Sequence, residues 1–356
     1  MNHLRELLTD VSARALRYQE ELGQRKVAPT PEAIDRLAQL GGPLPAEPAD
    51  AKTVLALLDE IGSPATVATT GGRFFGFVTG GALPAALAAN WLAGAWDQNA
   101  FSYISSPVAV VLEEIALRWL IDVLKLPHGC GGAFVTGATM ANFTALAAAR
   151  HAVLKQVGWD VEAEGLFGAP PVTVVVGSEA HPTLHKALGL LGLGRERVLR
   201  LPADGQGRMR ADSLPPLSGP TIVCLQAGNV NTGAFDQVGE VCAIAHEAGA
   251  WVHVDGAFGM WAAAASARAH LAAGVSDADS WATDAHKWLN VPYDSGLAFV
   301  RHPEPLKAAM SISAAYLPQG ETREPMHYTP EASRRARGVE VWAALRSLGR
   351  DGLADL

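Results

Sequence analysis

Residues 278–290 read Ala-Asp-Ser-Trp-Ala-Thr-Asp-Ala-His-Lys-Trp-Leu-Asn, and they place Lys287 between a histidine and a tryptophan. Upstream, residues 251–257 read Trp-Val-His-Val-Asp-Gly-Ala, a short run of strand-forming residues that ends at Asp255. A buried strand that ends in a carboxylate needs a partner for that charge, because burying it unpaired is costly. We therefore expect Lys287 and Asp255 to face one ligand. Taken singly, each has an ordinary alternative, a surface lysine and a capping aspartate.

The chain around these two segments alternates between strand-like and helix-like stretches. Polar residues follow the strand-like stretches at their C-terminal ends, which is where ligands bind in open parallel sheets. The succession predicts an α/β fold with a mainly parallel, doubly wound sheet. The predicted strands are residues 132–135, 172–176, a stretch from residue 220, 251–255 and 297–300, and the helices between them include residues 140–153 and 240–248.

The turn between the first of these strands and its helix, residues 136–139, reads Thr-Gly-Ala-Thr. Small residues there leave backbone N–H groups exposed at a helix N-terminus, which is a favourable place for an anion. The turn is not GxGxxG and lacks the lysine of a P-loop, so neither a dinucleotide nor a nucleoside triphosphate is favoured. Taken alone, it is better explained as a strand-to-helix turn capped by threonine.

Two further segments have both a functional and an ordinary interpretation. His181 lies in a polar cluster after the strand at 172–176, and a single histidine in such a place is more often structural. Residues 71–81 are a dense mix of glycine and aromatic residues, which suits a loop that lines a pocket. Packing alone explains Phe74 and Phe75 equally well.

Taken together, the lysine segment, the aspartate segment, the turn at 136–139 and His181 resemble the motifs of the group II pyridoxal-phosphate amino-acid decarboxylases. That family includes the aromatic L-amino-acid, histidine and glutamate decarboxylases, and the four segments occur here in the family's order. The resemblance implies a fold type I pyridoxal-phosphate transferase-like sheet with an N-terminal helical segment. It also implies that Lys287 holds pyridoxal 5'-phosphate as a Schiff base and that Asp255 pairs with the protonated pyridine nitrogen.

The resemblance assigns roles to the remaining site residues. A histidine at the place of His181 stacks on the pyridine ring and can take part in proton transfer, and Ala257 is small enough for the ring to lie flat. Phe77 and Val78 are candidates for contact with the substrate side chain. The implied catalytic residues are Lys287, His181 and Asp255, and the implied cofactor-binding residues are Gly137, Ala138, Thr139, His181, Asp255, Ala257, His286 and Lys287.

The sequence departs from the family pattern in several places. Asp284 stands where the family often has asparagine, and an acid beside a phosphate is unfavourable unless it is turned away. The loop at 71–81 lacks the family's His-Pro opening and Pro-Thr pair, so the choice of substrate side chain is not carried over. Tyr316 and Tyr328 lie in a predicted lid loop, but neither aligns with the family tyrosine that delivers the final proton.

We predict three parts of the chain: an N-terminal helical segment at 1–70, a cofactor-binding domain at 71–310, and a lid loop with a linking helix at 311–356. That last helix is expected to include Arg334, Arg335, Arg337 and residues 339–342. In the resembled family such N-terminal helices pack across a homodimer, although they could also cover their own subunit. Family members continue beyond this point into a C-terminal domain, which we expect to be absent from this chain.

Composition limits the other classes of function. The net charge is −8 and the 28 Lys and Arg are scattered, so neither nucleic acid nor an anionic membrane surface is an expected partner. The 3 cysteines have no CxxC spacing, which predicts reduced core cysteines and no metal site. No signal peptide or membrane-spanning apolar stretch is apparent, and we expect a cytoplasmic protein.

The predicted function is decarboxylation of an L-amino acid to the amine and CO2 through the Lys287 Schiff base. Two alternatives stay open. One is another fold type I pyridoxal-phosphate enzyme, such as an aminotransferase or a carbon–sulfur lyase, and the other is a truncated, non-catalytic homologue.

Overall fold

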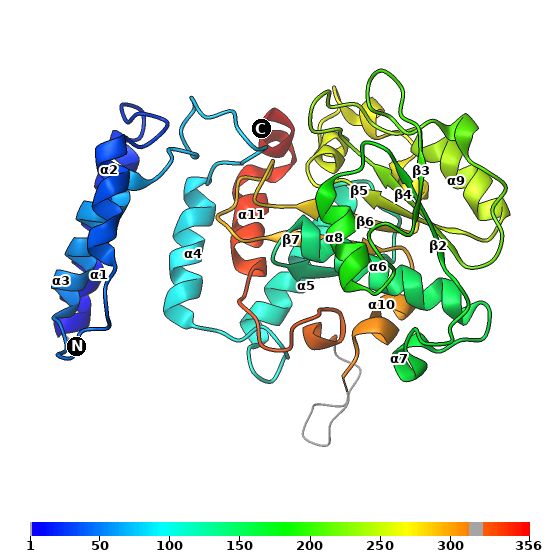
Figure 1. The fold of residues 1–356 in the computed structure, drawn as a ribbon. Coiled ribbons are helices and arrows are strands. Elements are labelled where there is room, and N and C mark those ends of the chain that lie inside the picture. Colours follow the sequence, from blue (N-terminus) through cyan, green and yellow to red (C-terminus); the bar gives the residue numbers. More distant parts are fainter. Residues whose placement is uncertain (1, 313–322) are drawn as a thin grey trace. The chain divides into compact units, whose positions relative to one another are not determined.

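The computed structural model describes residues 2–312 and 323–356, and the chain divides into two units, Met1–Gly81 and Ala82–Leu356 (Figure 1). The domain boundaries that the sequence predicts at residues 70 and 310 stay predictions. Among the described residues no helix is long and apolar enough to cross a membrane.

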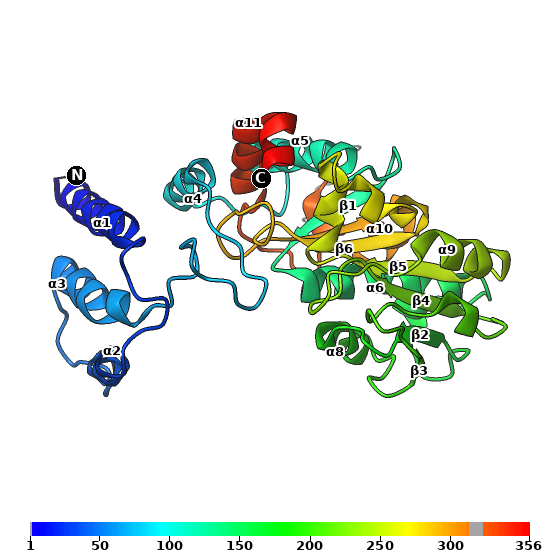
Figure 2. The same ribbon diagram turned by 90° about the horizontal axis from the view of Figure 1, so that it is seen from above.

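The first unit is built from helices, and ion pairs to Asp59 join the longest of them, α1 (Asn2–Glu21), to η2 (Leu58–Gly62). Arg14 of α1 donates to Asp10 on its own helix at 2.8 Å and to Asp59 at 3.0 Å. Both views show α1 and α3 side by side (Figures 1 and 2). No regular element forms at residues 71–81, as their glycine content predicts. The helices are α1 (Asn2–Glu21), α2 (Pro31–Arg36), η1 (Leu37–Leu40), α3 (Ala51–Leu57), η2 (Leu58–Gly62) and η3 (Ser63–Ala65).

The described part of the second unit forms one seven-stranded sheet in the order β1-β7-β6-β5-β4-β2-β3. Strands β2 to β6 pair in parallel, whereas β7 is antiparallel to both of its neighbours. The predicted mainly parallel α/β sheet is therefore confirmed. The strands are β1 (Gly131–Val135), β2 (Thr173–Gly177), β3 (Val198–Leu201), β4 (Thr221–Gln226), β5 (Trp251–Asp255), β6 (Ser280–Asp284) and β7 (Gly296–Val300).

Helices cover both faces of this sheet, and alternate residues of each strand point to opposite faces. On β5, Val252 and Val254 pack in the core that includes residues of α5, α9 and α11, whereas Trp251 packs with α6, α8 and α10. Residues 253 and 255 therefore share the face of α6. Figure 2 shows α6 and α8 on one side of the sheet. The helices are α4 (Pro84–Trp96), α5 (Pro107–Val123), α6 (Ala138–Lys155), α7 (Val161–Glu164), α8 (Pro182–Leu190), α9 (Val238–Glu247), α10 (Pro303–Met310) and α11 (Gly338–Asp355), with the short turns η4 (Ala211–Ser213), η5 (Gly259–Ala264), η6 (Ala269–Ala272), η7 (Val275–Asp277) and η8 (Pro325–His327).

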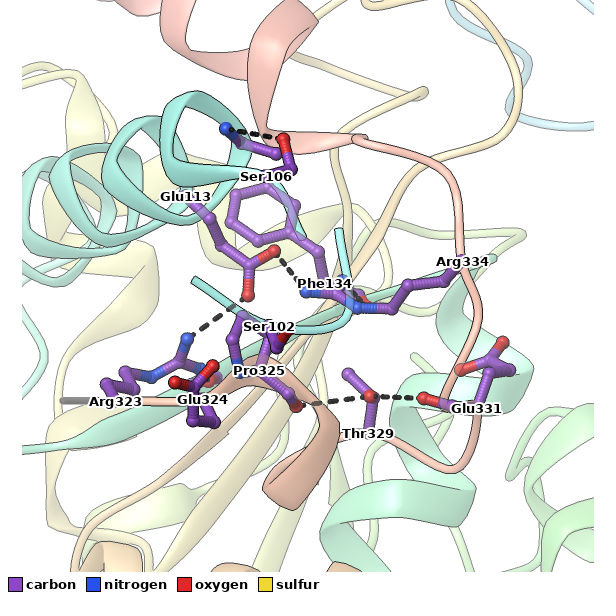
Figure 3. Close-up of polar contacts among 12 residues, drawn as sticks. Ser102, Ser106, Glu113, Phe134, Arg323, Glu324, Pro325, Thr329, Glu331 and Arg334 are labelled. Atoms are coloured by element: carbon purple, nitrogen blue, oxygen red, sulfur yellow. Dashed lines mark hydrogen bonds and ion pairs between the residues drawn. The ribbon is translucent and has the colours of Figure 1, made fainter. Parts of the chain in front are cut away.

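A buried ion cluster ties α5 to the chain on both sides of η8 (Figure 3). Glu113 of α5 is 1% exposed, and its carboxylate pairs with Arg334 and, at 3.2 Å, with Arg323. Arg334 also donates to the carbonyl of Phe134 at 3.2 Å. The guanidinium of Arg334 thus links β1 and α5.

The C-terminal helix begins later than the sequence predicts. It starts at Gly338, so Arg334, Arg335 and Arg337 lie before it rather than on it, whereas residues 339–342 lie on it as predicted. Arg334 is instead drawn toward the buried carboxylate of Glu113, which compensates its charge. Tyr316 of the predicted lid lies outside the described residues.

Candidate active site

The site is built at the C-terminal edge of the sheet, where two buried carboxylates, Asp255 and Asp284, end neighbouring strands. Asp255 ends β5 and is 5% exposed. Its Oδ2 accepts a hydrogen bond from Asn142 Nδ2 at 3.0 Å, and its Oδ1 accepts one from the Ala257 N–H at 3.2 Å. Burial raises the pKa of Asp255, and these two donors and the charge of Lys287 oppose that shift. A cationic partner would therefore be stabilised beside this carboxylate.

Lys287 follows β6 and reaches toward the end of that strand. Its Nζ lies 3.0 Å from Asp284 Oδ2, and its side chain is 20% exposed against 3% for Asp284. Asp255 and Asp284 end neighbouring parallel strands, β5 and β6. The amine is thus held in a half-buried position between two acidic strand ends.

Asp284 also contacts the N-terminus of α6, at the turn that the sequence predicts to bind an anion. The Ala138 N–H donates to Asp284 Oδ1 at 2.6 Å. The first N–H groups of a helix have no intrahelical acceptor and carry partial positive charge, so they stabilise an anion there. The carboxylate is therefore not turned away from the anion site but lies on it.

Glycines allow this close packing. A Cβ on Gly296, the first residue of β7, would lie 2.4 Å from the Gly137 Cα, which would push the backbone of the turn away. A Cβ on Gly137 would meet the His286 ring at 3.3 Å and Asp284 Oδ1 at 3.5 Å. The turn can approach β7 this closely only because Gly296 lacks a side chain, whereas a side chain on Gly137 would only crowd the His286 ring.

His286 is oriented by its backbone neighbour. Its Nδ1 accepts a hydrogen bond from the Ser295 N–H at 3.0 Å, and its ring lies 4.3 Å from the ring of Tyr293. Burial lowers the pKa of His286, so the ring is neutral with its proton on Nε2. That nitrogen lies 3.4 Å from Asp284 Oδ1, beside the anion site.

His181 lies at the opposite end of the site. It is the N-cap of α8, and its Nδ1 accepts a hydrogen bond from the Thr183 N–H at 3.3 Å. His181 and Asp255 line the same small cavity, which extends to Gln226 at the end of β4. The ring of His181 is exposed and thus accessible to a molecule that enters there.

The structure brings the predicted site residues into two adjoining groups. Lys287 and His286 meet the Gly137–Ala138 turn through Asp284, while His181 and Ala257 adjoin Asp255. Thr139 is the second residue of α6. The catalytic and binding roles of these residues stay predictions. Phe77 and Val78 belong to the first unit.

Sequence reasoning missed three buried polar residues behind Asp255: Asn142 on α6, His253 on β5 and Ser280 on β6. A signal for His253 was present, because it stands two residues before Asp255 and therefore shares its face of the strand. Asn142 is one of several polar residues of an Ala-rich helix, and only the packing of α6 on β5 shows what it contacts.

These residues fit the cofactor that the sequence resemblance implies. The N-terminus of α6 already holds an anionic group and would receive a phosphate, and Lys287 provides an amine beside it. The desolvated carboxylate of Asp255 lacks a cationic hydrogen-bond partner among the described residues, and a protonated pyridine nitrogen would supply one.

Comparison with known protein families supports this interpretation. The family described as "Pyridoxal-dependent decarboxylase conserved domain" matches residues 42–356. Tryptophan decarboxylase 1 of Oryza sativa subsp. japonica is 30% identical over 304 residues, a stretch that covers 78% of this chain and 58% of that protein. The aromatic-L-amino-acid decarboxylase of Bos taurus is 31% identical over 334 residues, with 87% of this chain and 67% of that protein covered.

Further relatives differ in the substrate that their names give. An acidic amino acid decarboxylase of Bos taurus is 29% identical over 304 residues, covering 82% of this chain and 57% of that protein. The chain thus spans somewhat more than half the length of the curated relatives it matches first.

Solved structures share the fold. The crystal structure of Oryza sativa TDC with PLP and tryptamine superposes with a TM-score of 0.90 at 25% identity, over 100% of this chain and 76% of that one. Mouse CSAD gives a TM-score of 0.89 at 25% identity, again over 100% of this chain and 76% of that one.

Proposed function

Since the chain belongs to the pyridoxal-dependent decarboxylase family, we propose that it removes the α-carboxyl group of an L-amino acid as CO2 and leaves the amine. The observation that carries the proposal is the convergence of Lys287, the α6 N-terminus and the buried carboxylate of Asp255 at one edge of the sheet. These are the three attachments that pyridoxal 5'-phosphate needs: an amine, a phosphate site and a partner for the ring nitrogen.

In this proposal each residue holds one part of the cofactor, and the bound cofactor supplies an electron-withdrawing ring that takes up the electron pair left when CO2 departs. Lys287 Nζ attaches the cofactor. The Ala138 N–H and His286 Nε2–H bind the phosphate, and Asp255 keeps a proton on the ring nitrogen. The contacts that Ala138, His286 and Lys287 each make with Asp284 support this part of the proposal.

His181 is proposed to lie against the ring and to limit the access of water to it. Its support is the cavity that it shares with Asp255, together with the hydrogen bond from Thr183 that fixes its ring. Ala257, which follows Asp255 by two residues and donates to it, presents a small side chain at the same edge.

The proposed partners are an amino-acid substrate and a second copy of the chain. Relatives named for aromatic and for acidic substrates are similarly close, so the side chain of the substrate is open to experiment. A homodimer is supported by large exposed apolar side chains, for example Leu4 at 61% and Leu16 at 59% on α1 and Trp91 at 45% on α4. A cytoplasmic location stays a prediction from the sequence.

The decisive experiment is to load the purified chain with pyridoxal 5'-phosphate and reduce it with borohydride. We expect the cofactor to become fixed to Lys287, and we expect aromatic or acidic amino acids to release CO2. The Lys287→Ala variant should lose both signals, whereas Lys155→Ala, at a lysine with a 61% exposed side chain, should keep them. Amino exchange with a keto acid in place of CO2 release would contradict decarboxylation, and labelling of Lys287→Ala would contradict the site.

A further inference from the structure

A chain of hydrogen bonds runs from the interior of the sheet to the carboxylate of Asp255. Trp251 Nε1 donates to Ser280 Oγ at 2.8 Å, and Ser280 Oγ lies 2.9 Å from His253 Nδ1. His253 Nε2 lies 2.8 Å from Asn142 Oδ1, and Asn142 Nδ2 donates to Asp255 Oδ2 at 3.0 Å. All five residues are buried.

The two end groups, the carboxylate of Asp255 and the indole N–H of Trp251, determine which group donates in each of these hydrogen bonds. An ionised carboxylate only accepts, so Asn142 turns its NH2 group to Asp255 and its carbonyl oxygen to His253. That oxygen also only accepts, so the proton of His253 is on Nε2. The ring is neutral, because complete burial lowers the pKa of His253 to about 3.

The hydrogen bonds of Ser280 and Trp251, at the end of the series farthest from Asp255, agree with this tautomer of His253. Nδ1 of a neutral His253 protonated on Nε2 must accept, and Ser280 is its neighbour there. The hydroxyl of Ser280 can donate to Nδ1 because its oxygen already accepts from the indole N–H of Trp251, which can only donate. Four consecutive hydrogen bonds therefore donate in one direction, toward Asp255.

We propose that His253 is a positioning residue of the cofactor site: through Asn142 it orients Asp255 and stabilises its ionised form, while Ser280 and Trp251 hold His253 in the Nε2–H tautomer. The proposal rests on the proposed function in one respect, that Asp255 faces the ring nitrogen of the cofactor. Hydrogen bonds aligned in a low-dielectric interior polarise one another, so distant members of the chain contribute to the charge of the carboxylate.

The aligned hydrogen bonds counteract the effect of burial on the protonation of Asp255. Asp255 is desolvated, which raises its pKa, and a protonated Asp255 could not keep a proton on the ring nitrogen. Asn142 alone would provide one donor. With His253 bound to its carbonyl oxygen, the Asn142 amide is both fixed in orientation and made a stronger donor.

The tautomer is tested first, in the cofactor-free wild-type protein. Nitrogen-15 NMR of the imidazole rings should show His253 as the neutral Nε2–H form from pH 7 to pH 5. A His253 that is charged in this range, or protonated on Nδ1, would overturn the proposal. This measurement needs neither activity nor a variant, so its result is independent of the proposed function.

Binding then separates positioning from general structural support. Affinity is measured for pyridoxal 5'-phosphate and for its carbocyclic analogue, in which C–H replaces the ring nitrogen. His253→Leu should weaken binding of the natural cofactor about tenfold, the scale of a lost charge-assisted hydrogen bond, and leave the analogue within about twofold. His253→Gln, whose amide restores a donor near the position of Nε2, should stay within about threefold of wild type for both ligands.

Ser280→Ala gives a second test that keeps the imidazole. It removes the hydroxyl that donates to Nδ1, so the tautomer of His253 is no longer fixed. The affinity for the cofactor should fall about threefold, and the affinity for the analogue should not change. Equal losses of both ligands in either variant would show a merely structural role and overturn the proposal. If wild type bound neither ligand, the proposed function would fail, whereas the NMR result would still decide the tautomer.

Discussion

At the scale of single residues, Asp284 is the least expected feature of the site. Its carboxylate accepts the Ala138 N–H at 2.6 Å and pairs with Lys287 at 3.0 Å, so a residue of the protein holds the place proposed for the phosphate. Two anions cannot occupy one helix N-terminus without mutual repulsion. Cofactor binding must therefore displace Asp284 or be weakened by it.

Replacement of Asp284 by Asn should strengthen binding of pyridoxal 5'-phosphate, by about tenfold at low salt, because the repulsion is removed. Unphosphorylated pyridoxal should bind with unchanged affinity, since it brings no second anion. Absorbance titrations of both ligands measure the difference, with the exposed Asp212→Asn as the matched control. An equal gain for both ligands would attribute the effect to Lys287 rather than to the phosphate site.

The burial of His253 predicts a pH dependence of protein stability that can be measured without the cofactor. Burial lowers its pKa to about 3 in the folded state, while an unfolded histidine titrates near ~6.5. Between these values the unfolded chain binds more protons, so the contribution of His253 is fully present above pH ~6.5 and is lost as the pH falls toward ~3.

The free energy of unfolding of wild type should consequently fall by ~2 kcal/mol more than that of His253→Gln when the pH is lowered from 7 to 5. Urea unfolding of the cofactor-free proteins at the two pH values checks this. Parallel pH profiles for the two proteins would mean that His253 titrates normally and is not held neutral.

At the scale of elements, the sequence predicts most of the sheet and its mainly parallel pairing, but not the antiparallel direction of β7. The run at 297–300 is found as β7 at Gly296–Val300, and the helix at 140–153 as α6 at Ala138–Lys155. Composition marks these stretches as buried, yet nothing in residues 297–300 shows that β7 runs antiparallel between β1 and β6. That direction depends on the connection through residues 285–295.

The candidate site likewise has residues that the sequence predicts and contacts that it does not. Asp255 is predictable because a carboxylate that ends a buried strand needs a partner, and Lys287 is predictable because its segment resembles the family's lysine motif. The contact of Asn142 with Asp255 is not, because it joins residues 113 positions apart and depends on how α6 packs on β5. The same holds for Arg334, which periodicity assigns to a helix and the fold assigns to Glu113.

The Glu113 cluster should be a principal source of stability for the contact between α5 and β1 (Figure 3). Glu113→Gln leaves the guanidinium of Arg334, whose side chain is 1% exposed, without a counter-charge and should destabilise the protein by about 3–5 kcal/mol. The double variant Glu113→Leu with Arg334→Met should recover a large part of this loss, because it removes both buried charges. Unfolding in urea measures both, and Glu114→Gln is the adjacent control. A cost below ~1 kcal/mol for Glu113→Gln would contradict a dry, buried pair.

At the scale of the whole molecule, the question is what covers the apolar side chains of the first helix. Leu4, Leu8 and Leu16 of α1 are 61%, 56% and 59% exposed, although they are spaced by four and eight residues and therefore lie on one side of the helix. The ion pair of Arg14 with Asp59 holds a different side of α1 against its own unit. An exposed apolar stripe beside a satisfied polar face is typical of a helix that packs against another chain.

If a second copy of the chain covers this stripe, a charge placed on it should prevent association. The Leu4→Glu, Leu8→Glu variant should sediment as a monomer at concentrations where wild type is a dimer, because each buried glutamate would lack a partner. His3→Glu adds a charge to the same helix at an exposed position that lies about 100° around the helix from Leu4, away from the stripe, and it should leave the dimer intact. Analytical ultracentrifugation over a range of concentrations gives the association constants. The dimer contact through α1 would be refuted by a wild-type chain that stays monomeric at all concentrations. It would also be refuted by a double variant that associates like wild type. In the second case, α4 with its exposed Trp91 would be the next surface to change.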